Sequence, residues 1–235
     1  MIQLYTVPGA WGLSSVSPFC AKLETWLRLA QLRFEVLPAS MGSAPKGKVP
    51  YIKLEDGTLM GDSQLILEHL TQRYGVQLDD WLSPAQKAQS QVVRRMLEEG
   101  TYWCLVHERW NTEAGFAAYT PVFLKMLPPV IGGLILGQIR RDVRGSLKAQ
   151  GTGRHKPEEI AGILRADVAA VADLLGDRLY FHGDQPSSVD ATIYAMLSGL
   201  ASFPVPGAGS AELAKHPNVV AYLARVRKKA WPEEA

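Results

Sequence analysis

The chain has 235 residues, of which 47% are hydrophobic and 20% charged, and its formal net charge is +2. This composition is typical of a soluble globular protein that buries one large core or two smaller ones. The small net charge gives no indication of a nucleic-acid-binding surface. The only cysteines, Cys20 and Cys104, lie on unrelated segments. Neither a disulfide framework nor a metal site is expected, and a reducing compartment, the cytoplasm, is favoured. No signal-peptide pattern is visible at the start of the sequence.

The first third of the chain alternates between strand and helix patterns. Apolar spacing and turn signals predict a strand, a helix, a strand, a two-stranded hairpin and a helix, at residues 2–7, 18–32, 34–37, 51–54 with 58–60, and 66–74. The turn of the hairpin is Glu55-Asp56-Gly57, a strong hairpin signal. The predicted order is therefore βαβ followed by ββα.

The start of the first predicted helix combines capping residues with candidate reactive groups. Ser17 suits the N-cap, Pro18 suits the first helical position, and Cys20 opens an apolar stripe along the helix. The unpaired N–H groups and the dipole at a helix start favour a thiolate or a carboxylate over its neutral form. A group placed at Ser17 is thus next to an anion-binding position.

The rest of the chain is predicted to be helical. Residues 76–83 have the composition of a linker, and a long helix extends from Ser83-Pro84 to about Trp110. Further helices are predicted at residues 157–175, 189–203 and 217–226. These patterns predict two domains, residues 1–77 and residues 84–235.

Residues 128–139 are almost uncharged and end at Arg140 and Arg141. About twenty apolar residues are needed to span a bilayer, and three glycines interrupt this shorter run. We therefore predict a buried helix here and no transmembrane segment. Peripheral attachment to a membrane is the alternative.

Several short motifs together resemble the cytosolic glutathione transferase family. Lys48-Val49-Pro50 precedes a predicted strand, Gly61-Asp62-Ser63 joins the hairpin to a helix, and Ser187-Ser188-Val189-Asp190 fits a capping box. With Ser17-Pro18-Phe19-Cys20 they follow the order and approximate spacing of that family. The segments SPFCAKLETWLR, PKGKVPYI and QGTGRHKPEEI more specifically resemble its failed-axon-connections and metaxin-like branch.

The resemblance implies a thioredoxin-like α/β domain followed by an all-α domain, with glutathione bound by the first. It implies a cis bond between Val49 and Pro50, with the Val49 backbone paired to the cysteinyl amide of glutathione. Asp62 is expected at the ligand's ammonium group, Ser63 at its γ-glutamyl carboxylate and Lys48 at its glycyl carboxylate. Capping of the following helix explains Asp62 and Ser63 equally well.

At the catalytic position, the resemblance implies that the Ser17 hydroxyl donates a hydrogen bond to the glutathione sulfur. Ser14 and Ser15 are near enough in sequence to take this role instead. Cys20 has no partner cysteine for a dithiol cycle, so a small core residue is favoured over a redox group.

The electrophile is expected between the domains, next to Trp11, Tyr102, Trp103 and His107. Ordinary core packing explains the spacing of the aromatic residues as well. The predicted function is a glutathione-dependent transferase, in which glutathione thiolate attacks an apolar electrophile or a peroxide. The alternative is a non-catalytic binding or adaptor protein of the same fold, including a membrane-associated one. The family also implies a homodimer.

Overall fold

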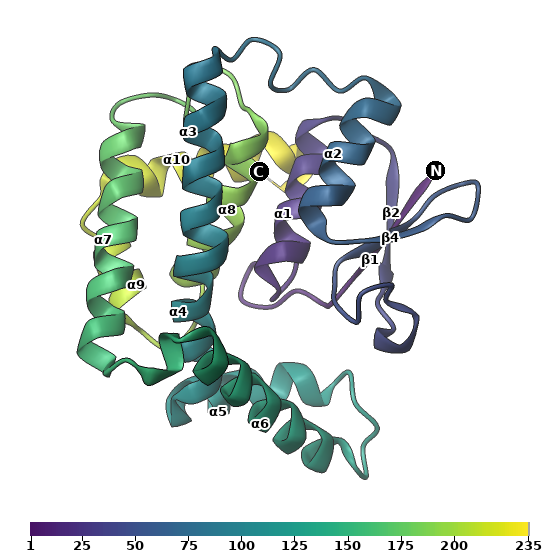
Figure 1. Cartoon of the computed structure of the whole chain (residues 1–235), viewed down its shortest axis with the longest axis vertical. Helices are drawn as coiled ribbons and strands as arrows, with labels where there is room; N and C mark the ends of the chain where they lie inside the picture. The colour runs from purple at the N-terminus through teal and green to yellow at the C-terminus, as the bar shows by residue number, and fades with distance from the viewer. Residues whose placement is uncertain (235) are drawn as a thin grey trace.

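The computed structural model describes residues 1–234 (Figure 1). Its N-terminal part is built on a mixed sheet with the strand order β2-β1-β3-β4, in which only the β1–β2 pair is parallel. The strands are β1 (Ile2–Thr6), β2 (Phe34–Pro38), β3 (Tyr51–Lys53) and β4 (Leu59–Gly61). The predicted βαβ and ββα order is confirmed.

Two helices accompany the sheet, α1 (Pro18–Leu29) and α2 (Ser63–Tyr74), with a short 3-10 turn, η1 (Met41–Ser43), between β2 and β3. Helix α2 ends at Gly75, whose left-handed conformation is the usual helix stop. Helix α1 is buried on all its faces, because α2 lies against it on one side and α8 of the helical part on another. The sequence predicts burial of only one apolar stripe of this helix.

The remainder is helical, as predicted. The elements are α3 (Pro84–Arg95), α4 (Tyr102–Val106), α5 (Glu113–Leu124), α6 (Gly132–Gln150), α7 (Pro157–Leu175), α8 (Ser188–Ala201), α9 (Ala208–Leu213) and α10 (Pro217–Ala230), with the short 3-10 turns η4 (Thr152–Arg154) and η5 (Pro232–Glu234). Two wider π-helical segments, η2 (Met96–Thr101) and η3 (His107–Asn111), flank α4 in the long central helix. Extra residues of this kind turn the side chains that follow to another face of the helix.

The predicted capping box at the start of α8 is present. Asp190 is fully buried and accepts hydrogen bonds from the Ser187 N–H (2.7 Å) and hydroxyl (2.8 Å). It also accepts from the Phe181 N–H (2.9 Å) and the Tyr222 hydroxyl (2.7 Å). One carboxylate therefore joins α8, α10 and the loop before α8.

Helices α5 and α6 form a hairpin at one end of the molecule (Figure 1). The prediction of a buried helix at residues 128–139 is confirmed only in part, because α6 begins at Gly132 and buries Leu136, whereas the preceding loop lies on the surface. Val130 is 94% exposed and Leu134 is 78% exposed. No helix within residues 1–234 is both long and apolar enough to cross a bilayer.

Candidate functional site

The segments that carry the predicted site residues meet at one edge of the sheet. Tyr51 of β3 lies between Tyr5 of β1 and Gly61 of β4 in the pairing register. Pro50 directly precedes Tyr51, and Asp62 directly follows Gly61. The end of β1, the start of β3 and the start of α2 are therefore neighbours.

Ser17 is held at this edge through Ser15. The Ser15 hydroxyl donates to the carbonyl of Val7, just after β1, at 2.8 Å, and accepts from the Ser17 N–H at 3.2 Å. The Ser17 hydroxyl oxygen is the N-cap of α1 and accepts from the Cys20 N–H at 3.5 Å. As an acceptor in the cap, it keeps its own proton for donation to another group. The half-buried Ser17 can therefore cap the helix and donate to a ligand at the same time.

The other two serines are placed differently. Ser15 is 1% exposed, and its proton is committed to Val7. Ser14 lines a cavity of about 220 Å³ together with Gly12, Leu13, Tyr194, Arg227 and Trp231. Neither arrangement matches that of Ser17, which is half-buried and caps the start of α1.

Cys20 is a core residue in the structure. Its thiol is fully buried, and burial raises its pKa, although the neighbouring polar groups of Thr6, Ser17, Val7 and Ser15 act in the opposite direction. Cys20 is therefore protonated at neutral pH.

The Val49–Pro50 peptide bond is cis, the geometry that the resemblance implies. Val49 lies just outside the β1–β3 ladder, and neither its N–H nor its C=O is hydrogen-bonded to another residue within 1–234. Pro50 is buried, whereas Lys48 is exposed and forms no ion pair with a described residue. A strand edge with free backbone groups is suited to pairing with a peptide.

Asp62 caps α2 and has an unusual backbone conformation. One carboxylate oxygen accepts from the N–H groups of Gln64 (3.0 Å) and Leu65 (3.2 Å). Its φ of 85° is in a region that non-glycine residues rarely adopt, and such conformations occur often at functional sites. The other carboxylate oxygen of Asp62 and the hydroxyl of Ser63 bond to none of the residues described. Both are available to a ligand as well as to the helix.

A buried ion pair that the sequence does not predict joins α1 to η2 beside α2. The Lys22 ammonium of α1 is fully buried and donates to Glu98 in η2 (2.6 Å) and to Gln64 in α2 (2.8 Å). Glu98 also pairs with Arg94 at 2.9 Å. Burial lowers the pKa of Lys22, and the charges of Glu98 and Asp62 oppose this. No local signal in the sequence distinguishes Lys22 from a surface lysine.

The Arg109 guanidinium is a second buried charge that the sequence does not predict, and it holds the residue before Ser17. Arg109 of η3 is buried and donates to the Val16 carbonyl (3.0 Å), the Tyr119 hydroxyl (3.0 Å) and the Gly199 carbonyl (2.6 Å). The Tyr119 hydroxyl donates to the same Val16 carbonyl at 2.9 Å. The helical part of the chain thus fixes the backbone that leads into Ser17.

The predicted aromatic residues pack on a second core cluster rather than on an open cleft. Trp11, Tyr102 and Trp103 are half-buried and all contact this cluster, which includes Tyr119 and Phe203. The Tyr102 and Trp103 rings are 5.5 Å apart, and burial raises the pKa of Tyr102 to about 12. The structure therefore brings these three predicted residues together.

His107 lies elsewhere, on a cavity of about 210 Å³. Phe203 connects the two places, since it lines this cavity and its ring lies 5.4 Å from that of Trp11. Burial lowers the pKa of His107, so this imidazole is neutral at neutral pH. Within residues 1–234, no group of three or more His, Cys, Asp or Glu side chains is arranged to hold a metal ion.

Comparisons with known proteins agree with this architecture. The N-terminal domain family of glutathione S-transferases matches residues 18–115, and the C-terminal domain family matches residues 164–226. The isoprene-epoxide glutathione S-transferase of Rhodococcus sp. (strain AD45) is 35% identical, over 97% of this chain and 99% of its own. The chain belongs to the glutathione S-transferase family, whose co-substrate is glutathione, and the enzyme class predicted from the sequence is confirmed.

Relatives of the predicted branch are also found. Failed axon connections of Drosophila melanogaster is 30% identical over 99% of this chain, and human Metaxin-1 is 25% identical over 98%. This chain spans only 59% and 51% of those two proteins, respectively. Among solved structures, the glutathione S-transferase of Rhodospirillum rubrum F11 has a TM-score of 0.61 at 18% identity, covering 99% of this chain and 91% of its own. One from Ceriporiopsis subvermispora, in complex with glutathione, has the same TM-score and identity, covering 100% of this chain and 98% of its own.

Proposed function

We propose that the protein ionises glutathione beside Ser17 and joins the glutathione, through its sulfur, to a small apolar electrophile. The observation that supports this most is the position of Ser17, whose hydroxyl caps α1 and keeps a proton to donate. A hydroxyl donor and a helix start both favour a thiolate over a thiol. A lowering of the thiol pKa from about 8.5 by roughly two units makes most of it thiolate at neutral pH.

The remaining contacts of glutathione are assigned to the same edge of the sheet. The free backbone groups of Val49, preceding Pro50, pair with the cysteinyl amide. The start of α2, at Asp62 and Ser63, binds the γ-glutamyl end, and the exposed Lys48 is at hand for the glycyl carboxylate. The Val49 backbone groups, the second carboxylate oxygen of Asp62, the Ser63 hydroxyl and the Lys48 ammonium have no hydrogen-bond or ion-pair partner among the residues described.

An epoxide is the electrophile class that we favour, because a relative matched over 99% of its own length is named for one. The thiol proton leaves to solvent when glutathione binds. The thiolate sulfur then forms a bond to one epoxide carbon, the bond from that carbon to oxygen breaks, and the resulting alkoxide takes a proton from water. The aromatic surface of Trp11, Tyr102 and Trp103 is proposed to hold the apolar part of the substrate.

Titration with glutathione by calorimetry, followed by turnover assays with epoxides, aryl halides and peroxides, tests this function. We expect saturable glutathione binding and a thiolate absorbance in the ultraviolet at neutral pH. The absence of heat at millimolar glutathione would reject the proposal. The non-catalytic adaptor would then be the better explanation, since relatives include Failed axon connections and Metaxin-1.

Three further expectations accompany this function. We propose that the chain acts in the cytoplasm, as a homodimer, and that its domains divide between residues 77 and 84. Sedimentation velocity measures whether the chain is a homodimer, and limited proteolysis locates the domain boundary.

A further inference from the structure

The tip of the α5–α6 hairpin carries a concentration of exposed apolar side chains. Between residues 124 and 134, five large hydrophobic side chains are exposed: Leu124, Met126, Val130, Ile131 and Leu134. Residues 126–139 contain no charged side chain. Surface patches of this kind usually mark a contact with another molecule or with a membrane.

Basic side chains border this tip on both helices. Lys125 ends α5, and Arg141 follows Leu134 by seven residues, which places the two on the same face of α6. Both are exposed, and neither forms an ion pair within residues 1–234. Their charges are therefore available to an anionic partner.

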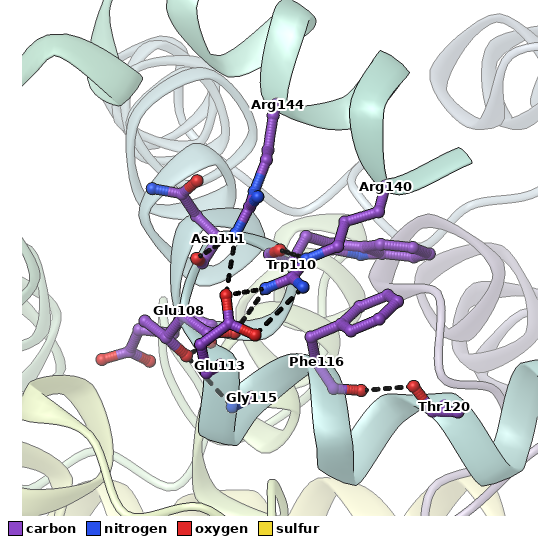
Figure 2. A network of polar contacts seen from close by, with 10 residues as sticks. Glu108, Trp110, Asn111, Glu113, Gly115, Phe116, Thr120, Arg140 and Arg144 are labelled. Atoms are coloured by element: carbon purple, nitrogen blue, oxygen red, sulfur yellow. Dashed lines mark hydrogen bonds and ion pairs between the residues drawn. The ribbon is translucent and has the colours of Figure 1, made fainter. Parts of the chain in front are cut away.

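The base of the hairpin is fixed, so the tip has a defined position (Figure 2). Arg140 donates to both carboxylate oxygens of Glu113, at 2.8 and 3.1 Å, and to the Trp110 carbonyl at 3.0 Å. Its guanidinium lies 4.0 Å from the centre of the Phe116 ring. Arg144 donates to Glu113 (3.2 Å) and to the Asn111 carbonyl (3.0 Å). Arg140 and Arg144 are therefore paired with Glu113, whereas Lys125 and Arg141 form no ion pair within residues 1–234.

We propose that this tip inserts into the surface of a membrane that contains anionic lipid. Apolar side chains enter the boundary between headgroups and acyl chains, and the basic border contacts the lipid phosphates and carboxylates. A second copy of the chain fits less well, because two such tips would bring Lys125 and Arg141 against their own copies. A stable homodimer also needs about 800 Å² from each partner, and five side chains on a loop tip form a small patch by comparison.

Co-sedimentation with vesicles tests this proposal. We expect the full chain to bind vesicles of phosphatidylcholine mixed with phosphatidylserine, more weakly at high salt, and to bind vesicles of phosphatidylcholine alone much less. Val130→Asp and Leu134→Asp should each lower the partition coefficient at least about tenfold, because each removes an inserted side chain and adds a charge. Arg141→Glu should reduce the preference for phosphatidylserine. Val130 is almost fully exposed, so its substitution does not threaten folding.

Val220→Asp is the matched control. Val220 is another exposed valine, on α10 and outside the hairpin, and its substitution should leave vesicle binding unchanged. The proposal is overturned if the full chain ignores phosphatidylserine vesicles, or if Val130→Asp and Val220→Asp weaken binding equally. Gel filtration adds a third outcome: if Val130→Asp dissolves an oligomer of a chain that does not bind vesicles, the tip is a contact between copies.

Discussion

At the scale of single residues, the hydroxyl of Ser17 has two functions that substitution can separate. It accepts the Cys20 N–H as a helix cap, and we assign to its proton a bond to glutathione sulfur. Ser17→Ala should lower turnover by roughly ten- to a thousand-fold and raise the pKa of bound glutathione. Glutathione affinity should change much less. Steady-state kinetics and ultraviolet titration of the thiolate measure these effects.

Helix destabilisation is the alternative cause of such a loss, and Ser17→Gly controls for it. Glycine replaces a serine cap at a cost of only a few tenths of a kcal/mol, whereas alanine costs about 1 kcal/mol. If the two variants lose activity in parallel with stability, the assignment of Ser17 as the donor is wrong. Ser14→Ala, on the neighbouring cavity, should remain active.

Cys20 gives the opposite expectation. Because its thiol is buried and its pKa is raised, it stays protonated at neutral pH and is not a nucleophile. Cys20→Ala should leave the pKa of bound glutathione unchanged and destabilise the fold by about 1 kcal/mol through a small cavity. Denaturant unfolding and the same thiolate titration measure both quantities. A folded but inactive Cys20→Ala variant would instead support thiol chemistry at Cys20.

At the scale of elements, the contact of η3 and α5 with the loop before α1 has a measurable role. Tyr119→Phe removes the hydroxyl that donates to Val16 and accepts from Arg109. We expect kcat to fall several-fold with little change in KM for glutathione, because the loop still folds but holds Ser17 less accurately. Steady-state kinetics on the purified variant provide the measurement.

Tyr222→Phe is the matched control for this variant. It deletes the buried hydrogen bond from the Tyr222 hydroxyl to Asp190, in the first turn of α8, and should reduce stability by roughly 1 to 3 kcal/mol. Its kcat should stay at the wild-type value. Equal losses of kcat in the two variants would show that stability alone, and not the placement of Val16, accounts for the effect.

At the scale of the whole molecule, buried thiol and phenol groups should reduce the stability of the fold at alkaline pH. Burial raises the pKa of Cys104 from 9.0 to about 12 and raises those of Cys20 and Tyr119. Groups with a raised folded-state pKa favour folding below their unfolded value and lose this contribution as the pH rises through the folded value. The free energy of unfolding should therefore fall from about pH 9 towards pH 12. Urea unfolding across this range measures it, and Cys104→Ala should make the fall shallower.

Local signals account for the parts of the fold that sequence analysis predicted. Ser17-Pro18, Glu55-Asp56-Gly57 and the capping box at Ser187 each specify a turn or a helix start by chemistry within a few residues. The predicted position of the glutathione site at one edge of the sheet followed from a resemblance rather than from spacing. Local chemistry therefore predicts whether a segment forms a helix, a strand or a turn.

Long-range partners explain what was missed. Lys22 and Arg109 are buried because Glu98, Val16 and Gly199 meet them from distant parts of the chain, and no neighbouring residue predicts that meeting. The error at residues 128–139 is of the opposite kind, because burial was predicted where the structure leaves side chains exposed. The sequence predicts burial of the whole uncharged run, whereas the structure buries Leu136 in a core cluster and leaves Val130 and Leu134 exposed.

The burial of α1 has a consequence for how the molecule comes apart. Helix α1 packs against α8, and Arg109 holds the carbonyl of the residue before Ser17, so the position of α1 depends on the second half of the chain. Opening the junction between the halves would expose α1 and α8 in one step. Their slowest amide protons should then exchange with solvent at the same rate, and glutathione should slow both together, although it is expected to contact only one of them.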